Sequence, residues 1–113
     1  DTNTSNYISI VYDTNAQKVV IVYRDAGNSN YGTAIVGTVS GTSISYGTAV
    51  VYNSGATEEQ QATYDSTNNK IVIAYSDAGN GNYGTAVVRM TLMLKRLWLP
   101  IKITVIVTMA LRS

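Results

Sequence analysis

Two polar loops carry the residue types in this chain that are best suited to bind a ligand. The loops read DAGNSN at residues 25–30 and DAGNGN at residues 77–82, and a tyrosine follows each loop. Oxygens of Asp and Asn beside a glycine suit a hard cation such as calcium, although the later ligands and terminal Glu of an EF-hand are missing. The same groups hydrogen-bond sugar hydroxyls, and tyrosine rings stack on sugar faces. The sequence therefore predicts a ligand site at four equivalent positions in or directly after each loop: Asp25, Asn28, Asn30 and Tyr31 in the first, and Asp77, Asn80, Asn82 and Tyr83 in the second.

A structural interpretation of the same residues stays open. Asp, Gly and Asn are typical of tight connections between strands. The carboxylates Asp13 and Asp65 occupy equivalent turns, which is typical of residues that stabilise a turn. Tyr23 and Tyr75 precede the two loops and are compatible with core or rim packing.

Residues for the usual enzyme chemistries are missing. The chain contains no His and no Cys, which removes the commonest general base, the commonest metal ligand and thiol catalysis. We therefore expect a protein that is not an enzyme, with no catalytic or metal-binding residue and no cofactor; calcium at the loops is the one candidate. A net charge of +1 with 13% charged residues also argues against nucleic acid as a partner, because phosphate binding requires a basic surface.

The loops belong to a longer internal repeat. Residues 12–36 and 64–88 align without a gap at a constant offset of 52, and 16 of the 25 pairs are identical. Segments of high strand propensity alternate with turn formers, which predicts an all-β fold. The expected strands are residues 7–12, 18–25, 31–39 and 44–52, and then 61–64, 70–77 and 83–88, with residues 53–55 as the turn between the two copies.

Strand 18–25 indicates how these strands are packed. Its centre reads VVIVY, and the equivalent segment 71–75 reads IVIAY, so both faces of each strand are apolar. Such strands are covered on both sides, as in stacked sheets. A period of about 50 residues with four strands is typical of one β-propeller blade. We predict four-stranded antiparallel β-propeller-type blades, with about one and a half repeats in residues 1–88. The chain would then be an open fragment of a larger ring, whose open blade edges invite self-association.

The loops also resemble the Asp-box of sialidase-like propellers, Ser-x-Asp-x-Gly-x-Thr-Trp. Asp25 with Gly27, and Asp77 with Gly79, match it, whereas a tyrosine replaces the serine and the final aromatic comes one residue late. In that family the box is a structural turn, so the resemblance implies fold and not catalysis.

Residues 7–88 as a whole are similar to the repeats of secreted or surface-displayed bacterial and phage β-propeller proteins. That resemblance implies a non-enzymatic module that recognises carbohydrate or another surface, with glycans as partners and a secreted, cell-surface or virion-surface location. The alternative is a truncated structural repeat with no ligand of its own.

Residues 89–113 differ in chemistry, since they hold every Leu, Met, Trp and Pro of the chain. One interpretation is a membrane segment, but residues 97–111 are fewer than the roughly 20 that a spanning helix needs, and Pro100 and Lys102 interrupt them. We therefore do not expect this tail to insert into a membrane. A second interpretation is an amphipathic helix or strand that covers the open edge of the repeat.

The third and favoured interpretation is that the tail is the same repeat translated out of frame. In the shifted frame the Met-Thr pair at 90–91 forces the codon GAC, an aspartate, which aligns with Asp13. The Met-Ala pair at 109–110 forces GGC, a glycine, which aligns with Gly32. The codons between them permit a sequence close to residues 12–34.

The coding DNA tests this interpretation directly. We expect the shifted codons of residues 89–113 to spell a third copy that begins Tyr-Asp and ends Asn-Tyr-Gly-Thr-Ala. Sequencing the gene is the measurement, and shifted codons that do not spell the repeat would refute the frameshift.

Overall fold

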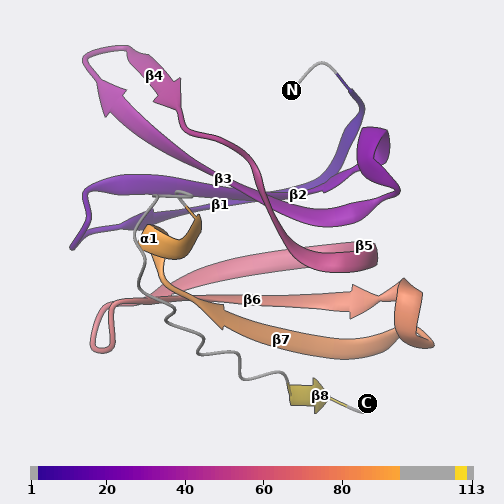
Figure 1. Ribbon diagram of the computed structural model, residues 1–113. Coiled ribbons are helices and arrows are strands. Elements are labelled where there is room, and N and C mark those ends of the chain that lie inside the picture. The colour runs from indigo at the N-terminus through magenta and orange to yellow at the C-terminus, as the bar shows by residue number, and fades with distance from the viewer. Residues whose placement is uncertain (1–2, 95–108, 112–113) are drawn as a thin grey trace.

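The computed structural model describes residues 3–94 and 109–111. The chain forms an open antiparallel sheet with the strand order β1-β2-β3-β5-β6-β7-β8, and β4 pairs with β3 outside this path (Figure 1). The all-β prediction is therefore confirmed. Most of the tail, and with it the predictions made for residues 95–108, lies outside the described residues. The strands are β1 (Ser5–Asp13), β2 (Lys18–Asp25), β3 (Tyr31–Ser40), β4 (Ser43–Tyr46), β5 (Val50–Asp65), β6 (Lys70–Asp77), β7 (Tyr83–Arg89) and β8 (Met109–Leu111); the helical turns are η1 (Ala26–Asn28), η2 (Ala78–Asn80) and α1 (Thr91–Leu94).

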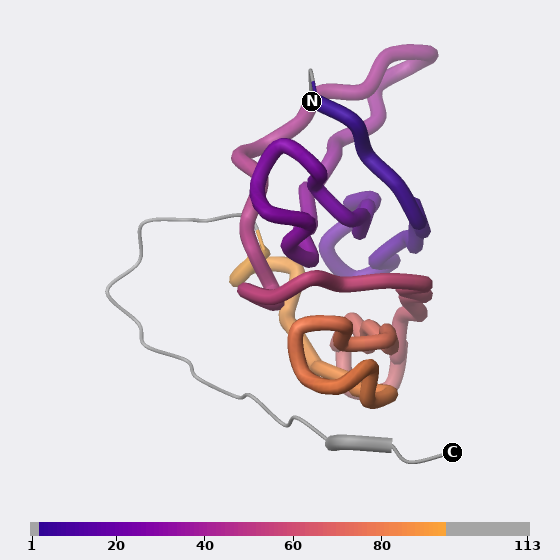
Figure 2. Tube along the Cα trace, turned by 90° about the vertical axis from the view of Figure 1, so that its right-hand side faces the viewer, coloured from indigo at the N-terminus to yellow at the C-terminus, as the bar shows by residue number. Residues whose placement is uncertain are grey.

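The long strand β5 divides the sheet into two layers. Its first part pairs with β3, where Val50 lies opposite Ala34. Its second part pairs with β6, where Ala62 lies opposite Ile73. The first layer therefore comprises β1, β2, β3 and the start of β5, and the second comprises the rest of β5 with β6, β7 and β8. Figures 1 and 2 show the two layers one above the other, with β5 running between them.

The predicted strand 44–52 and the predicted turn 53–55 are wrong. Residues Ser43–Tyr46 instead fold back on β3 as β4, and the chain re-enters the sheet at Val50. The segment 53–55 lies within β5, and the β3–β5 pairing shifts register twice beside it. The side-chain amide of Asn53 donates a hydrogen bond to the Thr57 hydroxyl across this irregular part of the strand, at 2.8 Å. The predicted strand 61–64 is accordingly the end of β5, whereas the boundaries predicted for β2 and β6 are confirmed.

The backbone of the second layer follows that of the first at the 52-residue offset. Tyr7 in β1 and Glu59 in β5 both have a positive φ, of 51° and 53°, beside equivalent register shifts. The last strand takes an equivalent place without keeping the 52-residue offset: β8 places Leu111 opposite Gly84, as β5 places Asn53 opposite Gly32. The short strand β8 thus fills the place in the second layer that β5 fills in the first.

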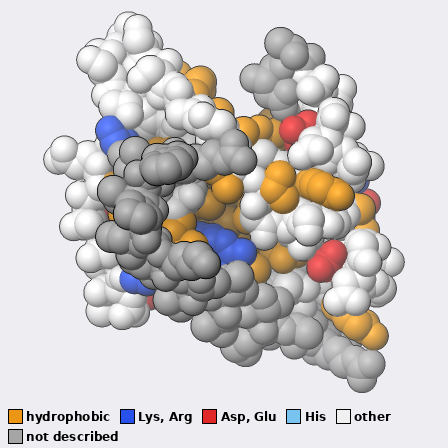
Figure 3. All heavy atoms as spheres, viewed as in Figure 1, with side chains coloured by type: hydrophobic (Ala, Val, Ile, Leu, Met, Phe, Trp, Pro, Cys, Tyr) orange, Lys and Arg blue, Asp and Glu red, His pale blue; other side chains and the backbone are white. Residues whose placement is uncertain are grey.

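The main core lies between the two layers. Val20 and Val22 of β2 are fully buried, as are Ile71 and Ile73 of β6. Aromatic rings add to this contact, because Tyr52 of β5 meets Tyr75 of β6 edge-on with 5.5 Å between ring centres. The complete cluster is Val20, Val22, Ala34, Val36, Tyr52, Ile71, Ile73, Tyr75, Val87 and Leu94. On the side viewed in Figure 1, other hydrophobic side chains reach the surface among polar ones (Figure 3).

The two layers contribute opposite faces to this core. We call the face that carries Ile21 in the first layer and Ile73 in the second the front face, and the face that carries Val20 and Val72 the back face. The back face of the first layer is buried against the front face of the second, as the burial of Val20 and Ile73 shows. This front-to-back packing explains the apolar back face of β2 and the apolar front face of β6.

Substitution of equivalent isoleucines should measure the difference between the two front faces. Ile73→Ala should reduce the free energy of unfolding by about 2–5 kcal/mol, because Ile73 is fully buried. Ile21→Ala is the matched control and should cost half of that or less, because Ile21 is only partly buried. Urea denaturation of dilute protein gives both values, and equal losses would contradict the front-to-back packing.

Candidate functional site

The two predicted ligand loops lie at the same end of the two layers, which we call the rim. Each loop forms one 3-10 turn, η1 after β2 and η2 after β6 (Figures 1 and 2). Each turn ends in a left-handed residue, Ser29 with φ 56° and Gly81 with φ 64°. Because the chain then returns as β3 or β7, Tyr31 and Tyr83 begin equivalent strands at the rim.

In the first loop, polar groups mainly hold the loop together. The Asp25 carboxylate accepts a hydrogen bond from the Gly27 amide at 2.9 Å and so caps η1. The backbone amide of Asn30 donates to the backbone carbonyl of Asp25 at 2.9 Å. The backbone carbonyl of Asn30 accepts from the backbone amide of Thr57 in β5 at 3.0 Å. Asn28 is exposed and Tyr31 is half-buried, so the Asn28 side chain is the most accessible of the first four predicted residues.

In the second loop, the carboxylate has a different partner. The Asp77 carboxylate accepts a hydrogen bond from the side-chain amide of Asn53 at 3.4 Å and does not cap its own turn. The backbone amide of Asn82 closes the loop on the Asp77 carbonyl at 3.0 Å. Asn80, Asn82 and Tyr83 are exposed, and 41% of Tyr83 is accessible. The second loop therefore presents more of its predicted ligand-binding side chains than the first.

Two buried tyrosines lie directly beside the loops. Burial raises the pKa of Tyr75 to about 12, the Asp77 carboxylate adds to this rise, and the Arg89 guanidinium opposes it. Burial and the Asp25 carboxylate likewise raise the pKa of Tyr23. Both hydroxyls are therefore neutral at physiological pH, so the negative charges nearest these rings belong to the two aspartates.

The rim offers amide and aromatic groups more than a metal-binding cluster. In the described part of the chain, no three acidic, His or Cys side chains come together in a way that could hold a metal ion. Each loop brings one carboxylate, so calcium at the loops stays a prediction. Exposed amides donate and accept hydrogen bonds, and the Tyr83 side chain is 41% exposed.

Comparisons of the chain with family models, curated proteins and solved structures found no match. Among the described helices, none is long and apolar enough to cross a membrane. Any activity must therefore be argued from the geometry of the rim and of the two layers.

Sequence reasoning missed the polar contacts between the layers. Arg24 of β2 forms an ion pair with Glu58 of β5 at 3.1 Å and lies over the Tyr7 ring, 4.9 Å from its centre. Gln60 is almost fully buried, and neither its amide nitrogen nor its oxygen has a hydrogen-bond partner among the described residues. The available signal was the offset itself, because Gln60 is equivalent to the apolar Ile8.

The equivalent aspartates Asp13 and Asp65 both stabilise turns, as the structural interpretation expected. Asp13 accepts from the backbone amides of Asn15 and Ala16, each at 2.9 Å. Asp65 does the same for its own turn at 3.0 and 3.2 Å. Only Asp13 is buried, and it also accepts a hydrogen bond from the Thr91 hydroxyl of α1. Asp13 therefore ties the first layer to the segment that follows β7.

Replacing Asp13 should change the stability of the protein in acid. Burial raises the pKa of Asp13, but hydrogen bonds led by that from Thr91 outweigh burial and leave this pKa below its usual value. A carboxylate with a lowered pKa in the folded protein adds stability at pH values above its unfolded-state pKa of about 4. This stability is lost as the pH falls through the folded-state pKa. Asp13→Asn should therefore cost about 1 kcal/mol at pH 7 and make the fall in stability below about pH 4 shallower.

Asp65→Asn provides the matched control for this measurement. It changes the same kind of turn in an exposed place without touching Thr91, so its loss at pH 7 should be smaller. Thermal denaturation between pH 2 and 7 compares the two variants. Equal losses at pH 7 would show that the Thr91 contact contributes nothing.

Proposed function

We propose that this chain is part of a non-enzymatic binding module built from β-propeller-type blades, and that the rim contacts carbohydrate on a cell, virion or secreted surface. Front-to-back stacking of equivalent antiparallel layers supports this architecture, because blades repeat radially in that way. The strand β5 supports it further, since it ends one layer and begins the next.

The observation that carries the binding proposal is the exposure of polar and aromatic side chains at equivalent rim positions. Asn28 and Asn80 are exposed in the two loops, as are Asn82 at the end of the second loop and Tyr83 after it. Amides match the mixed donor and acceptor character of sugar hydroxyls, and tyrosine rings match the apolar face of a sugar. Two equivalent loops on one rim also allow weak contacts to add.

A specific observation favours the second candidate, a structural repeat without a ligand. The carboxylate of Asp25 caps its own turn, and that of Asp77 is bonded to Asn53. The most polar groups of both loops therefore already serve the fold. In this alternative, the exposed asparagines only solubilise the turns.

A glycan array, run with calcium and again with a chelator, separates the two candidates. The binding proposal expects retention of at least one glycan, and Asn80→Ala combined with Tyr83→Ser should weaken it about tenfold, since a lost stacking contact with a hydrogen bond is worth roughly 1–2 kcal/mol. Asn15→Ala is the control, because this exposed asparagine lies in the turn at the other end of β2. Absence of binding in both conditions would refute the proposal and leave the structural repeat.

A further inference from the structure

The front face of the first layer is apolar and partly exposed in the described part of the chain. Ile10, Ile21 and Ile35 form a row across three strands, because each lies opposite the next in the sheet. Ile8 and Ile10 are 63% and 59% exposed, and Tyr12 at the end of β1 is 50% exposed. Several large apolar side chains on one face mark an interaction surface more than isolated ones would.

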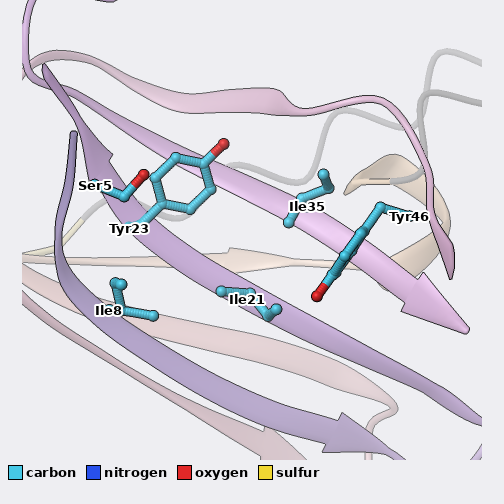
Figure 4. A pocket seen from close by; sticks show the side chains of 6 residues that line it. All are labelled: Ser5, Ile8, Ile21, Tyr23, Ile35 and Tyr46. Atoms are coloured by element: carbon cyan, nitrogen blue, oxygen red, sulfur yellow. The ribbon is translucent and has the colours of Figure 1, made fainter. Parts of the chain in front are cut away.

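The centre of this face is hollowed. A pocket of about 260 Å³ opens on it, and side chains from four strands surround it (Figure 4). Tyr46 of β4 lies beside Ile35 at one end, and Ser5 lies beside Tyr23 at the other. The residues that line the pocket are Ser5, Ile8, Ile21, Tyr23, Ile35 and Tyr46.

The second layer shows what covers such a face. Its row Ala62, Ile73 and Val87 is equivalent, residue by residue, to Ile10, Ile21 and Ile35 of the first layer. Ile73 and Val87 are buried at 0% and 2% exposure. The surface that covers them is the back face of the first layer, where Val22 and Ala34 lie opposite each other.

The same chain also carries a second back face. In the second layer, Val72 lies opposite Val88 and Ala74 opposite Ala86. These pairs are equivalent to Val20 with Val36 and Val22 with Ala34 in the first layer. Ala74 is exposed, whereas the equivalent Val22 is fully buried. One molecule therefore presents a partly exposed apolar front face and, on its other layer, a back face of the type that covers the equivalent front face.

We propose that the front face of the first layer binds the back face of the second layer of another copy of this chain. The geometry is that of the contact between the two layers within one copy. Because two different surfaces meet, the association is head-to-tail, and it produces a ring if the rotation closes or a filament if it does not. This association uses the faces of the layers rather than the strand edges, and it does not depend on what the rim binds.

One substitution between equivalent positions favours the contact between copies. Within one copy, the contact between layers buries Gln60 without hydrogen-bond partners among the described residues. Between copies, the equivalent residue is Ile8. Burying a polar amide without partners costs free energy, whereas burying an isoleucine is favourable. A second difference acts against the contact between copies. Ala74, which is equivalent to Val22, is smaller and buries less apolar area.

Light scattering coupled to size exclusion tests the proposal on the full chain. The unmodified chain should form dimers or larger assemblies whose mass rises with concentration. Ile10→Lys on the front face and Ala74→Lys on the back face should each weaken association at least tenfold. Leu92→Lys is the matched control, because Leu92 is 41% exposed on α1 and belongs to neither face, and it should associate like the unmodified chain.

Mixing the two variants gives the decisive result. The Ile10→Lys chain keeps its back face and the Ala74→Lys chain keeps its front face, so the mixture should form a one-to-one dimer that does not grow further. A second front-face variant, Ile8→Lys, should behave like Ile10→Lys, and circular dichroism checks that each variant is folded. An unmodified chain that stays monomeric, variants that still associate, or a mixture that stays monomeric would each overturn the proposal.

Discussion

The packing of the back face of the first layer on the front face of the second is the contact on which the other features of the fold depend. It requires an apolar back face on β2 and an apolar front face on β6, and it places Tyr52 edge-on against Tyr75. It also explains a glycine in β3: a Cβ on Gly32 would come within 2.7 Å of the Tyr52 ring. The close approach of these groups leaves no room for a side chain at that position.

The sequence predicted the strands whose boundaries depend on local signals. Lys18–Asp25 and Lys70–Asp77 were predicted without error, because β-branched residues end at Asp-Ala-Gly-Asn turns in both copies. β5 could not be predicted in this way. Asn53, Ser54 and Gly55 have strong turn propensity, but the two ends of β5 pair with strands from different layers. That tertiary pairing keeps the segment extended and overrides the local preference.

The candidate site shows the same division between local and tertiary information. The repeat alone places both loops at one end of the fold, since equivalent turns follow equivalent strands. It does not reveal how each carboxylate is used. Asp25 caps its own turn, whereas Asp77 is bonded to Asn53, which arrives from the strand that crosses between the layers. No spacing within the loop encodes a partner that lies 24 residues away.

Recognition and assembly would occupy different surfaces of this architecture, because the strands run from the rim to the opposite turns while the layers stack through their faces. Adding a layer therefore covers one apolar face and adds one loop to the rim without altering the loops already there. In a head-to-tail assembly each copy would contribute two equivalent loops, Asp25–Asn30 and Asp77–Asn82. Weak contacts at separate loops then add through effective concentration, so the affinity of such a rim would depend on the number of copies more than on the chemistry of any single loop.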